Sequence, residues 1–299
     1  MSFYGRMTMM IDLHTHSNAS DGEFSPARLI HEAHKRRLNA LALTDHDTLA
    51  GLESAGNEAA AAGIRFIPGI EINIDWKGEG TVPGLGPGGE LHLLGLGLWS
   101  PTTAFKEAVT ELSNRREARN RGILDRMHEL SIDASWEELL AIGGQGGHSI
   151  GRLHFASLLI KKRVVRNVQQ AFSRYLQPGK TLFVPKYGLS FDEAADLIGK
   201  SGGIPVLAHP MSLFIAWGRL PDLIKTLKER GLRGIEAWHP TAKAQSCRRL
   251  EDLGKSLGLY ITEGSDFHGS VRPDRKLGSS NRGREINDTV MEAIPELRL

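Results

Sequence analysis

Short apolar runs that end in a histidine or a carboxylate recur along this chain, and their recurrence limits the fold more than any other feature of the sequence. The runs alternate with stretches of helical period, which is the pattern of strands joined by helices. In a barrel of such units the carboxyl ends of the strands meet on one face, where active sites are built. The polar residues at or just past the expected strand ends are His14, His16, Asp45, His46, Glu71, His209, His239, Asp266 and His268. The alternation therefore predicts an α/β fold that gathers these side chains at one edge.

The apolar periodicity also predicts the order of the elements. Strands are expected over residues 7–13, 39–43, 65–70, 91–98, 183–185, 204–208, 234–238 and 259–262. Helices are expected to follow the N-cap Ser25, to end before Gly63, and to cover residues 190–200, 221–230, 243–257 and 287–293. The short apolar runs resemble parallel strands that are buried on both faces. His92 is an exception among the candidate residues, because it stands near the start of its run.

The first polar cluster already suggests a metal site. Alternation along a strand puts the imidazoles of His14 and His16 on the same face. Asp21 follows in a loop of Ser, Asn, Asp and Gly that can fold back over them. Two imidazoles and a carboxylate suit Zn, Mn or Fe. Two ordinary histidines near a turn are the better explanation of this pair when it is taken alone, so the prediction of a metal site depends on the other clusters.

The pattern changes between residues 101 and 181, where the period is helical and a glycine-rich break occupies residues 143–147. We expect an inserted helical subdomain here, whose length is normal for a small domain. The flanking residues 7–100 and 182–299 are then expected to form one barrel-type domain.

Basic charge is concentrated in the second half of this expected insert. The net charge of the whole chain is only +2, yet no Asp or Glu occurs between Leu139 and Phe191. The basic residues of this window are Arg152, Lys161, Lys162, Arg163, Arg166, Arg174, Lys180 and Lys186. Such asymmetry predicts an anionic partner, either phosphate or nucleic acid, and a solvated basic face is the alternative.

Several classes of protein and site are disfavoured by what the sequence lacks. Cys247 is the single cysteine, so an internal disulfide and a multi-cysteine metal site are both excluded. No apolar run reaches membrane-spanning length, and the first residues carry no cleavage pattern, so we expect a cytoplasmic protein. The glycine run lacks the Lys-Ser/Thr pair that a nucleoside triphosphate loop requires.

Five motifs together resemble the signature of the PHP (polymerase and histidinol phosphatase) family. They are His14-x-His16, Thr44-Asp45-His46-Asp47, Gly69-x-Glu71, Ala208-His209-Pro210 and Ser265-Asp266-Phe267-His268. The resemblance implies a distorted (β/α)7 barrel. The helical insert, with Gly151-Arg152-Leu153-His154, is similar to a branch whose members act as 3′,5′-nucleoside bisphosphate phosphatases and as 5′→3′ exoribonucleases on short RNA.

The resemblance further implies three divalent metal ions held only by nitrogen and oxygen ligands, with Mn first and Zn or Fe as alternatives. The three implied ligand groups are His14, His16, Glu71 and Asp266; Glu71, His92 and His209; and Asp21, His46 and His268. Asp45 would orient a ligand. This sequence departs from the family pattern in a long Gly- and Pro-rich stretch before His92, and in Leu153, where the branch usually has Pro.

The implied chemistry is hydrolysis by a metal-activated hydroxide that attacks phosphorus. Besides Asp45, the expected catalytic residues are Arg152, His154 and His239. A bisphosphate or an RNA 5′ end also needs a second anion site, for which Arg152 comes first because a guanidinium binds phosphate through two nitrogens. Lys186 and His239 are further substrate-binding candidates. The expected partner is a phosphorylated nucleotide or short RNA, with no membrane and no obligate protein partner.

Other functions remain open at this point. A small-metabolite phosphatase, for example one acting on histidinol phosphate, needs the same metals but no basic insert. A nucleic-acid-binding module with a degenerate metal site would lack turnover. A metal-dependent amidohydrolase shares the barrel and the His-x-His motif, but it needs a later His/Lys/Asp pattern that is not found here.

Overall fold

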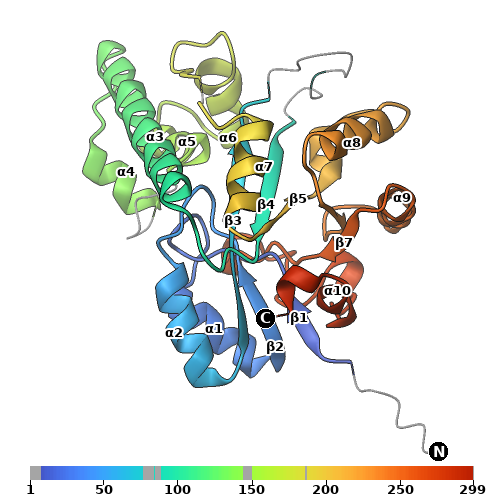
Figure 1. The fold of residues 1–299 in the computed structure, drawn as a ribbon. Coiled ribbons are helices and arrows are strands. Elements are labelled where there is room, and N and C mark those ends of the chain that lie inside the picture. The colour runs from blue at the N-terminus through green and yellow to red at the C-terminus, as the bar shows by residue number, and fades with distance from the viewer. Residues whose placement is uncertain (1–7, 77–83, 85–88, 144–149, 186, 299) are drawn as a thin grey trace, which may run out of the picture.

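The computed structural model describes residues 8–76, 84, 89–143, 150–185 and 187–298 (Figure 1). In this part of the chain a seven-stranded sheet follows the order of the sequence. Its strands are β1 (Met10–Asp12), β2 (Leu38–Leu43), β3 (Arg65–Ile74), β4 (Leu91–Leu96), β5 (Ile204–Leu207), β6 (Gly234–Trp238) and β7 (Tyr260–Glu263). The predicted mixed α/β fold is thereby confirmed.

The direction of β4 corrects the expectation of an all-parallel sheet. Neighbouring strands are parallel except at β4, which runs antiparallel to both β3 and β5. The start of β4 therefore lies at the same edge as the carboxyl ends of the other strands, and His92 pairs with Asn73 near the end of β3. His92 thus reaches the edge of the other histidines because its strand is reversed.

The segments that follow the first and last strands lie side by side. Thr15 and Phe267 form a parallel bridge. The amide of His16 donates to the carbonyl of Phe267 at 2.9 Å, and the amide of Asp266 donates to the carbonyl of His14 at 2.8 Å. These bonds join residues 14–16 to residues 266–267, so ligand candidates from opposite ends of the sequence become neighbours.

Helices connect the strands, and one follows the last strand, where the sequence predicts them. They are α1 (Pro26–Lys35), α2 (Leu52–Ala62), α7 (Phe191–Lys200), α8 (Leu220–Glu229), α9 (Ala244–Ser256) and α10 (Thr289–Glu292). The Ser25 hydroxyl accepts from the amide of Arg28, and Ser190 forms a capping box with Glu193. Gly63 ends α2 at φ +67°, a conformation that glycine adopts without a steric penalty.

Residues 103–176 contain helices and no strand in their described part. These helices are α3 (Thr103–Glu129), α4 (Trp136–Gly143), α5 (Arg152–Lys161) and α6 (Val168–Ala171), and a π-helical turn follows over Phe172–Leu176. In Figure 1, α3, α4 and α5 lie together on one side of the molecule. A buried apolar cluster between Ile123 and Leu182 joins them, whereas the first half of α3 packs on the core of the sheet.

The prediction of a short strand over residues 183–185 is wrong. Residues 183–185 form no strand, and the carbonyl of Phe183 accepts instead from the guanidinium of Arg126 at 2.7 Å. The backbone reaches the sheet later, where Leu189 forms a bridge with Ile74. A side chain on α3 has taken the hydrogen-bonding role that a neighbouring strand would have filled.

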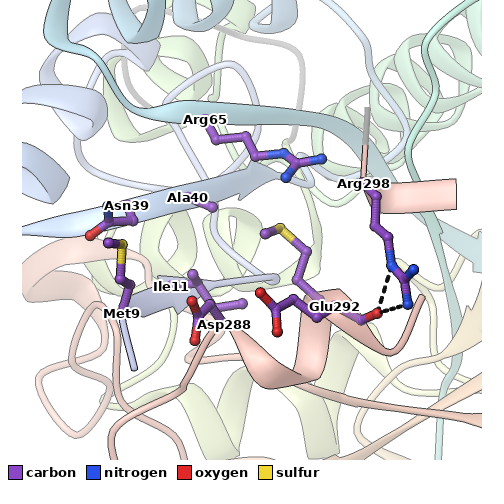
Figure 2. Close-up of a pocket in the computed structure, with 9 residues that line it drawn as sticks. Met9, Ile11, Asn39, Ala40, Arg65, Asp288, Glu292 and Arg298 are labelled. Atoms are coloured by element: carbon purple, nitrogen blue, oxygen red, sulfur yellow. Dashed lines mark hydrogen bonds between the residues drawn. The ribbon is translucent and has the colours of Figure 1, made fainter. Parts of the chain in front are cut away.

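A cavity of about 680 Å³ lies at the amino ends of β1, β2 and β3 (Figure 2). In Figure 2, Arg65 faces the carboxylates of Asp288 and Glu292 across it. The guanidinium of Arg298 donates to the main-chain carbonyl of Glu292 at 2.7 Å. The histidine-rich clusters belong to the opposite ends of these strands, so this cavity is separate from the site described next.

The segment after β7 is fastened to β1 through Asp12, which is fully buried. One carboxylate oxygen accepts from the amides of His14 at 3.2 Å and Ser265 at 3.0 Å, and the other accepts from the amide of Gly278 at 2.7 Å. Three buried N–H groups from three parts of the chain therefore donate to one carboxylate.

Replacing Asp12 with Ala is expected to lower the free energy of unfolding by about 3–5 kcal/mol, because it leaves three buried donors without an acceptor. Denaturant unfolding followed by circular dichroism measures this change. The exposed Asp274 is the matched control, and Asp274→Ala should change stability by less than about 0.5 kcal/mol. Equal stability of the two variants would contradict the assigned role of Asp12.

Candidate metal centre

The side chains predicted as metal ligands converge at one edge of the sheet. Within each of three groups, one nitrogen or oxygen atom per residue lies within 4.8 Å of the others. The groups are His14, His16, Glu71 and Asp266; His16, Asp21, His46 and His268; and His46, Glu71 and His92. The first group has the same members as the first group named from the sequence. The other two differ, since His16 joins the Asp21 group and His46 takes the place named for His209.

Glu71 is the centre of this arrangement, and its two oxygens face different histidines. Oε1 lies 2.9 Å from His92 Nδ1 and 2.9 Å from His209 Nε2. Oε2 lies 3.2 Å from the nearest ring nitrogens of His16 and His46 and 3.3 Å from His14 Nε2. A carboxylate placed in this way can bridge two cations.

The electrostatics of Glu71 keep it ionised. Its side chain is 1% exposed, and burial alone would raise the pKa of its carboxyl. Electrostatic interactions with the His46, His14 and His92 rings, together with a hydrogen bond from His14, outweigh burial and hold that pKa well below its usual value. Glu71 is therefore a permanent buried anion among imidazoles.

The donor set around Asp266 fits a cation. Its Oδ1 is buried and, among the described residues, accepts no hydrogen bond. His16 Nε2 lies 3.2 Å from this oxygen, His14 Nε2 lies 3.5 Å from it, and the two nitrogens are 3.1 Å apart. His14 Nδ1 is engaged 2.9 Å from a carboxylate oxygen of Glu236, so the proton of the neutral ring belongs on that nitrogen. Nε2 then directs a lone pair at the other acceptors, an arrangement that a metal ion satisfies.

The carboxylates also act on the protonation of the histidines. Burial would lower the pKa of His16, but hydrogen bonds and charge from Asp266 and Glu71 raise it to about 10. For His46 burial prevails and lowers the pKa to about 4. The cluster thus attracts positive charge at His16 and keeps the His46 ring neutral, as a ligand must be.

Glu236 is a functional residue that the sequence reasoning missed. It lies on β6, with Oε1 2.9 Å from His14 Nδ1, and its Oε2 accepts from the amide of His209 at 2.7 Å. One buried carboxylate therefore orients two of the predicted ligands. The available signal was a glutamate inside the apolar run Gly-Ile-Glu-Ala-Trp, which is expensive to bury without a partner.

Asp45 holds the loop that carries Asp21. Its Oδ1 accepts from the Ser17 amide at 2.8 Å and from the Ser20 hydroxyl at 2.6 Å, and its Oδ2 accepts from the Ser17 hydroxyl at 2.6 Å. Burial raises the pKa of this carboxyl, although the charge of His16 opposes the change. The contacts of Asp45 go to this loop, so the structure gives it a supporting position beside the ligand cluster.

The predicted catalytic and substrate-binding residues differ in their burial and in their contacts with the ligand cluster. His239 is buried, with Nε2 3.0 Å from Asp266 Oδ2. Arg152 Nη2 lies 3.3 Å from Glu90, whose other oxygen is 3.5 Å from His92 Nε2. His154 Nδ1 accepts from the amide of Gly151 at 3.0 Å at the start of α5. Lys186 lies outside the described residues.

Two arginines on α3 accompany Arg152 and were not identified from the sequence. Arg116 forms an ion pair with Asp47, beside His46. Arg119 Nη2 donates to Asn120 Oδ1 at 2.8 Å and to the Ile150 carbonyl at 3.3 Å. Burial and the positive charges of Arg116 and Arg152 lower the pKa of Arg119 to about 10. The available signal was the density of arginines in residues 114–121.

Comparison with known proteins finds a matching family and relatives that are similar over most of this chain. The profile of the PHP domain matches residues 12–180. The 5′-3′ exoribonuclease Rnm of Salmonella typhimurium is 31% identical over 87% of this chain and 85% of its own length. The 3′,5′-nucleoside bisphosphate phosphatase of Chromobacterium violaceum is 31% identical over 90% of each chain.

A solved structure is also similar. The structure of an amidohydrolase from Chromobacterium violaceum with bound sulfate has a TM-score of 0.76 and 29% identity over 91% of this chain and 90% of that one. Within the described residues, no helix combines the length and the apolar character needed to cross a bilayer.

Proposed function

This chain belongs to the PHP domain family and is a metal-dependent phosphoesterase, and from that premise we propose its substrates: nucleoside 3′,5′-bisphosphates and the 5′ ends of short RNA. The observation that carries the proposal is the group of partly buried guanidiniums of Arg116, Arg119 and Arg152 beside the ligand cluster. Burial and the nearby charges of Arg116 and Arg152 lower the pKa of Arg119, and an anion placed among the three guanidiniums would relieve their mutual repulsion. A substrate with two phosphates supplies such an anion in addition to the group that is hydrolysed.

We propose that three divalent ions occupy the ligand cluster, with Mn first and Zn or Fe as alternatives. Their proposed ligands are His14, His16, Asp21, His46, Glu71, His92, His209, Asp266 and His268. When bound, the ions would lower the pKa of water and stabilise charge on the phosphoryl oxygens. Two observations support this assignment. The two oxygens of Glu71 face different histidines, and the buried Oδ1 of Asp266 has no hydrogen-bond partner among the described residues.

The chain's own residues have separate roles in this proposal. Glu236 keeps the N–H proton of the neutral His14 ring on Nδ1. Asp45 fixes the loop that carries Asp21. Arg152 and Arg119 bind the phosphate that is not hydrolysed, with Lys186 as a further candidate. Burial lowers the pKa of His154, and the charge of Asp21, a proposed metal ligand, opposes that change. His239, which is buried with its Nε2 3.0 Å from Asp266 Oδ2, supports that carboxylate.

We also propose the finer features of the fold that the family resemblance implies. The bridge between Thr15 and Phe267 supports closure of the sheet into a distorted (β/α)7 barrel. The separate apolar cluster between Ile123 and Leu182 supports an inserted helical subdomain over residues 101–181, flanked by a barrel domain over residues 7–100 and 182–299.

Phosphate release tests the substrate proposal. Adenosine 3′,5′-bisphosphate, 5′-phosphorylated RNA oligomers and histidinol phosphate are compared in the presence of Mn²⁺. We expect the bisphosphate or the RNA to give the highest kcat/KM. Equal or faster turnover of histidinol phosphate would contradict the proposal and favour a small-metabolite phosphatase, while tight RNA binding without turnover under any divalent metal would favour a binding module.

Replacing Arg152 with Ala is expected to raise KM for adenosine 3′,5′-bisphosphate about tenfold to a hundredfold, the value of one charge-assisted hydrogen bond. Turnover of a phosphate monoester with one phosphate should change less than threefold. Initial rates on both substrates measure the difference. Arg166→Ala, which removes an exposed arginine of the same acid-free window, is the control, and an equal loss on both substrates would show that Arg152 does not read the second phosphate.

A further inference from the structure

Asp266 adopts a backbone conformation that residues other than glycine take infrequently. Its φ is +51°, in the left-handed region, which a non-glycine residue adopts at a cost in free energy that surrounding contacts offset. The amide of Asp266 is fixed by the carbonyl of His14 at 2.8 Å. The other restraints come from Arg275, in the segment after β7 to which the sequence analysis assigned no role.

The two carboxylate oxygens of Asp266 face in different directions. Oδ1 lies 3.2 Å from His16 Nε2 and 3.5 Å from His14 Nε2, on the side of the ligand cluster. Oδ2 contacts His239 Nε2 at 3.0 Å and the guanidinium of Arg275. One oxygen is thus left for a cation while the other is already engaged.

Arg275 also holds the main chain of Asp266. The same nitrogen, Nη1, donates to the Asp266 carbonyl at 3.1 Å. That carbonyl lies 2.8 Å from His268 Nδ1 as well, which leaves Nε2 of the His268 ring facing Asp21 at 3.2 Å. A single guanidinium therefore fixes the backbone and the carboxylate of one ligand candidate beside a second one.

The segment that carries Arg275 is anchored on both sides. Before it, the amide of Ser270 donates to the Glu23 carboxylate at 2.6 Å. After it, the amide of Gly278 donates to Asp12 at 2.7 Å. The Arg275 side chain is 11% exposed, so its guanidinium is presented to Asp266 from a fixed position and with little access for solvent.

We propose that Arg275 is a positioning residue of the metal centre, which occupies Oδ2 of Asp266 so that this carboxylate binds metal through Oδ1 alone. The inference rests on the proposed metal assignment. Without the guanidinium, the carboxylate can rotate about its Cβ–Cγ bond and offer both oxygens, and the left-handed backbone loses a restraint. Both changes alter the geometry at the metal, and residues that orient ligands typically change metal affinity tenfold to a hundredfold.

The test uses Co²⁺ as the probe, because its visible absorption reports coordination number without any need for turnover. We expect Arg275→Gln to weaken Co²⁺ binding about tenfold to a hundredfold and to change the intensity of the visible bands. Arg275→Lys should recover part of the affinity, since an ammonium group can neutralise Oδ2 but is a compact charge on a flexible stem, which holds the two acceptors less firmly than a planar guanidinium. Arg272→Gln, in the same segment and exposed, should match the wild type in both readouts.

The unfolding midpoint of each metal-free variant separates a role in the site from a role in stability alone. If Arg275→Gln lowered that midpoint but bound Co²⁺ with wild-type affinity and an unchanged spectrum, Arg275 would be structural and the inference wrong. If Arg275→Gln did not fold, Arg275→Lys would decide on the same criteria. A wild-type chain that bound no Co²⁺ would overturn the metal assignment itself, which is a different result from wild-type binding with unaffected variants.

Discussion

Replacing Glu71 with Gln is expected to lower kcat/KM on the order of 10³-fold or more, because this residue serves two sides of the ligand cluster with one carboxylate. Each of its oxygens lies 2.9–3.3 Å from histidine nitrogens of a different set. An amide keeps the size of the side chain but replaces one oxygen with an N–H donor and removes the charge. Glu71 pairs with His14 through one oxygen and with His92 through the other.

Phosphate release by purified Glu71→Gln, with circular dichroism to establish folding, measures this effect. Glu58→Gln is the matched control, because Glu58 pairs with His31 on the surface at 2.8 Å and should leave the rate unchanged. A folded Glu71→Gln protein with more than a tenth of the wild-type rate would contradict a bridging role.

Removing the metal with a chelator is expected to abolish turnover and to destabilise the fold. Glu71, Asp266 and Glu236 are buried carboxylates whose pKa values are all lowered: burial would raise them, but nearby imidazoles prevail. A cation that binds this ionised cluster only in the folded state adds about 4 kcal/mol of stability at a free concentration a thousand times its dissociation constant.

Differential scanning calorimetry before and after dialysis against EDTA measures that stabilisation, and assays after stepwise addition of Mn²⁺, Zn²⁺ or Fe²⁺ compare the metals. We expect the midpoint and the rate to recover together with one of them. Mg²⁺ is the control, because it prefers oxygen ligands and should restore little in a cluster rich in imidazole. Full activity after exhaustive chelation would be incompatible with the proposed centre.

The structure brings together most of the candidate site that the sequence predicts, and the reason is local. Alternation along the extended segment after β1, where Thr15 bridges Phe267, puts His14 and His16 on one face. Glu71 lies inside β3, and His209 and Asp266 follow the carboxyl ends of β5 and β7. Ser25, Gly63 and Ser190 mark helix ends by the hydrogen bonds and backbone angles that their own residue types favour. Such preferences act over a few neighbouring residues, so they can be read from the sequence.

What only the tertiary structure decided involves residues far apart in the chain. His92 joins the cluster because β4 is antiparallel, and strand direction depends on pairing with β3 and β5 rather than on the run Leu91–Leu96 itself. Glu236, Arg119 and Arg275 reach the site through contacts with residues that no spacing rule connects to them. The sequence by itself therefore determined which side chains can ligate, cap and alternate. The sheet order and the packing of distant segments determined which charges meet, because electrostatic contacts depend on distances in space.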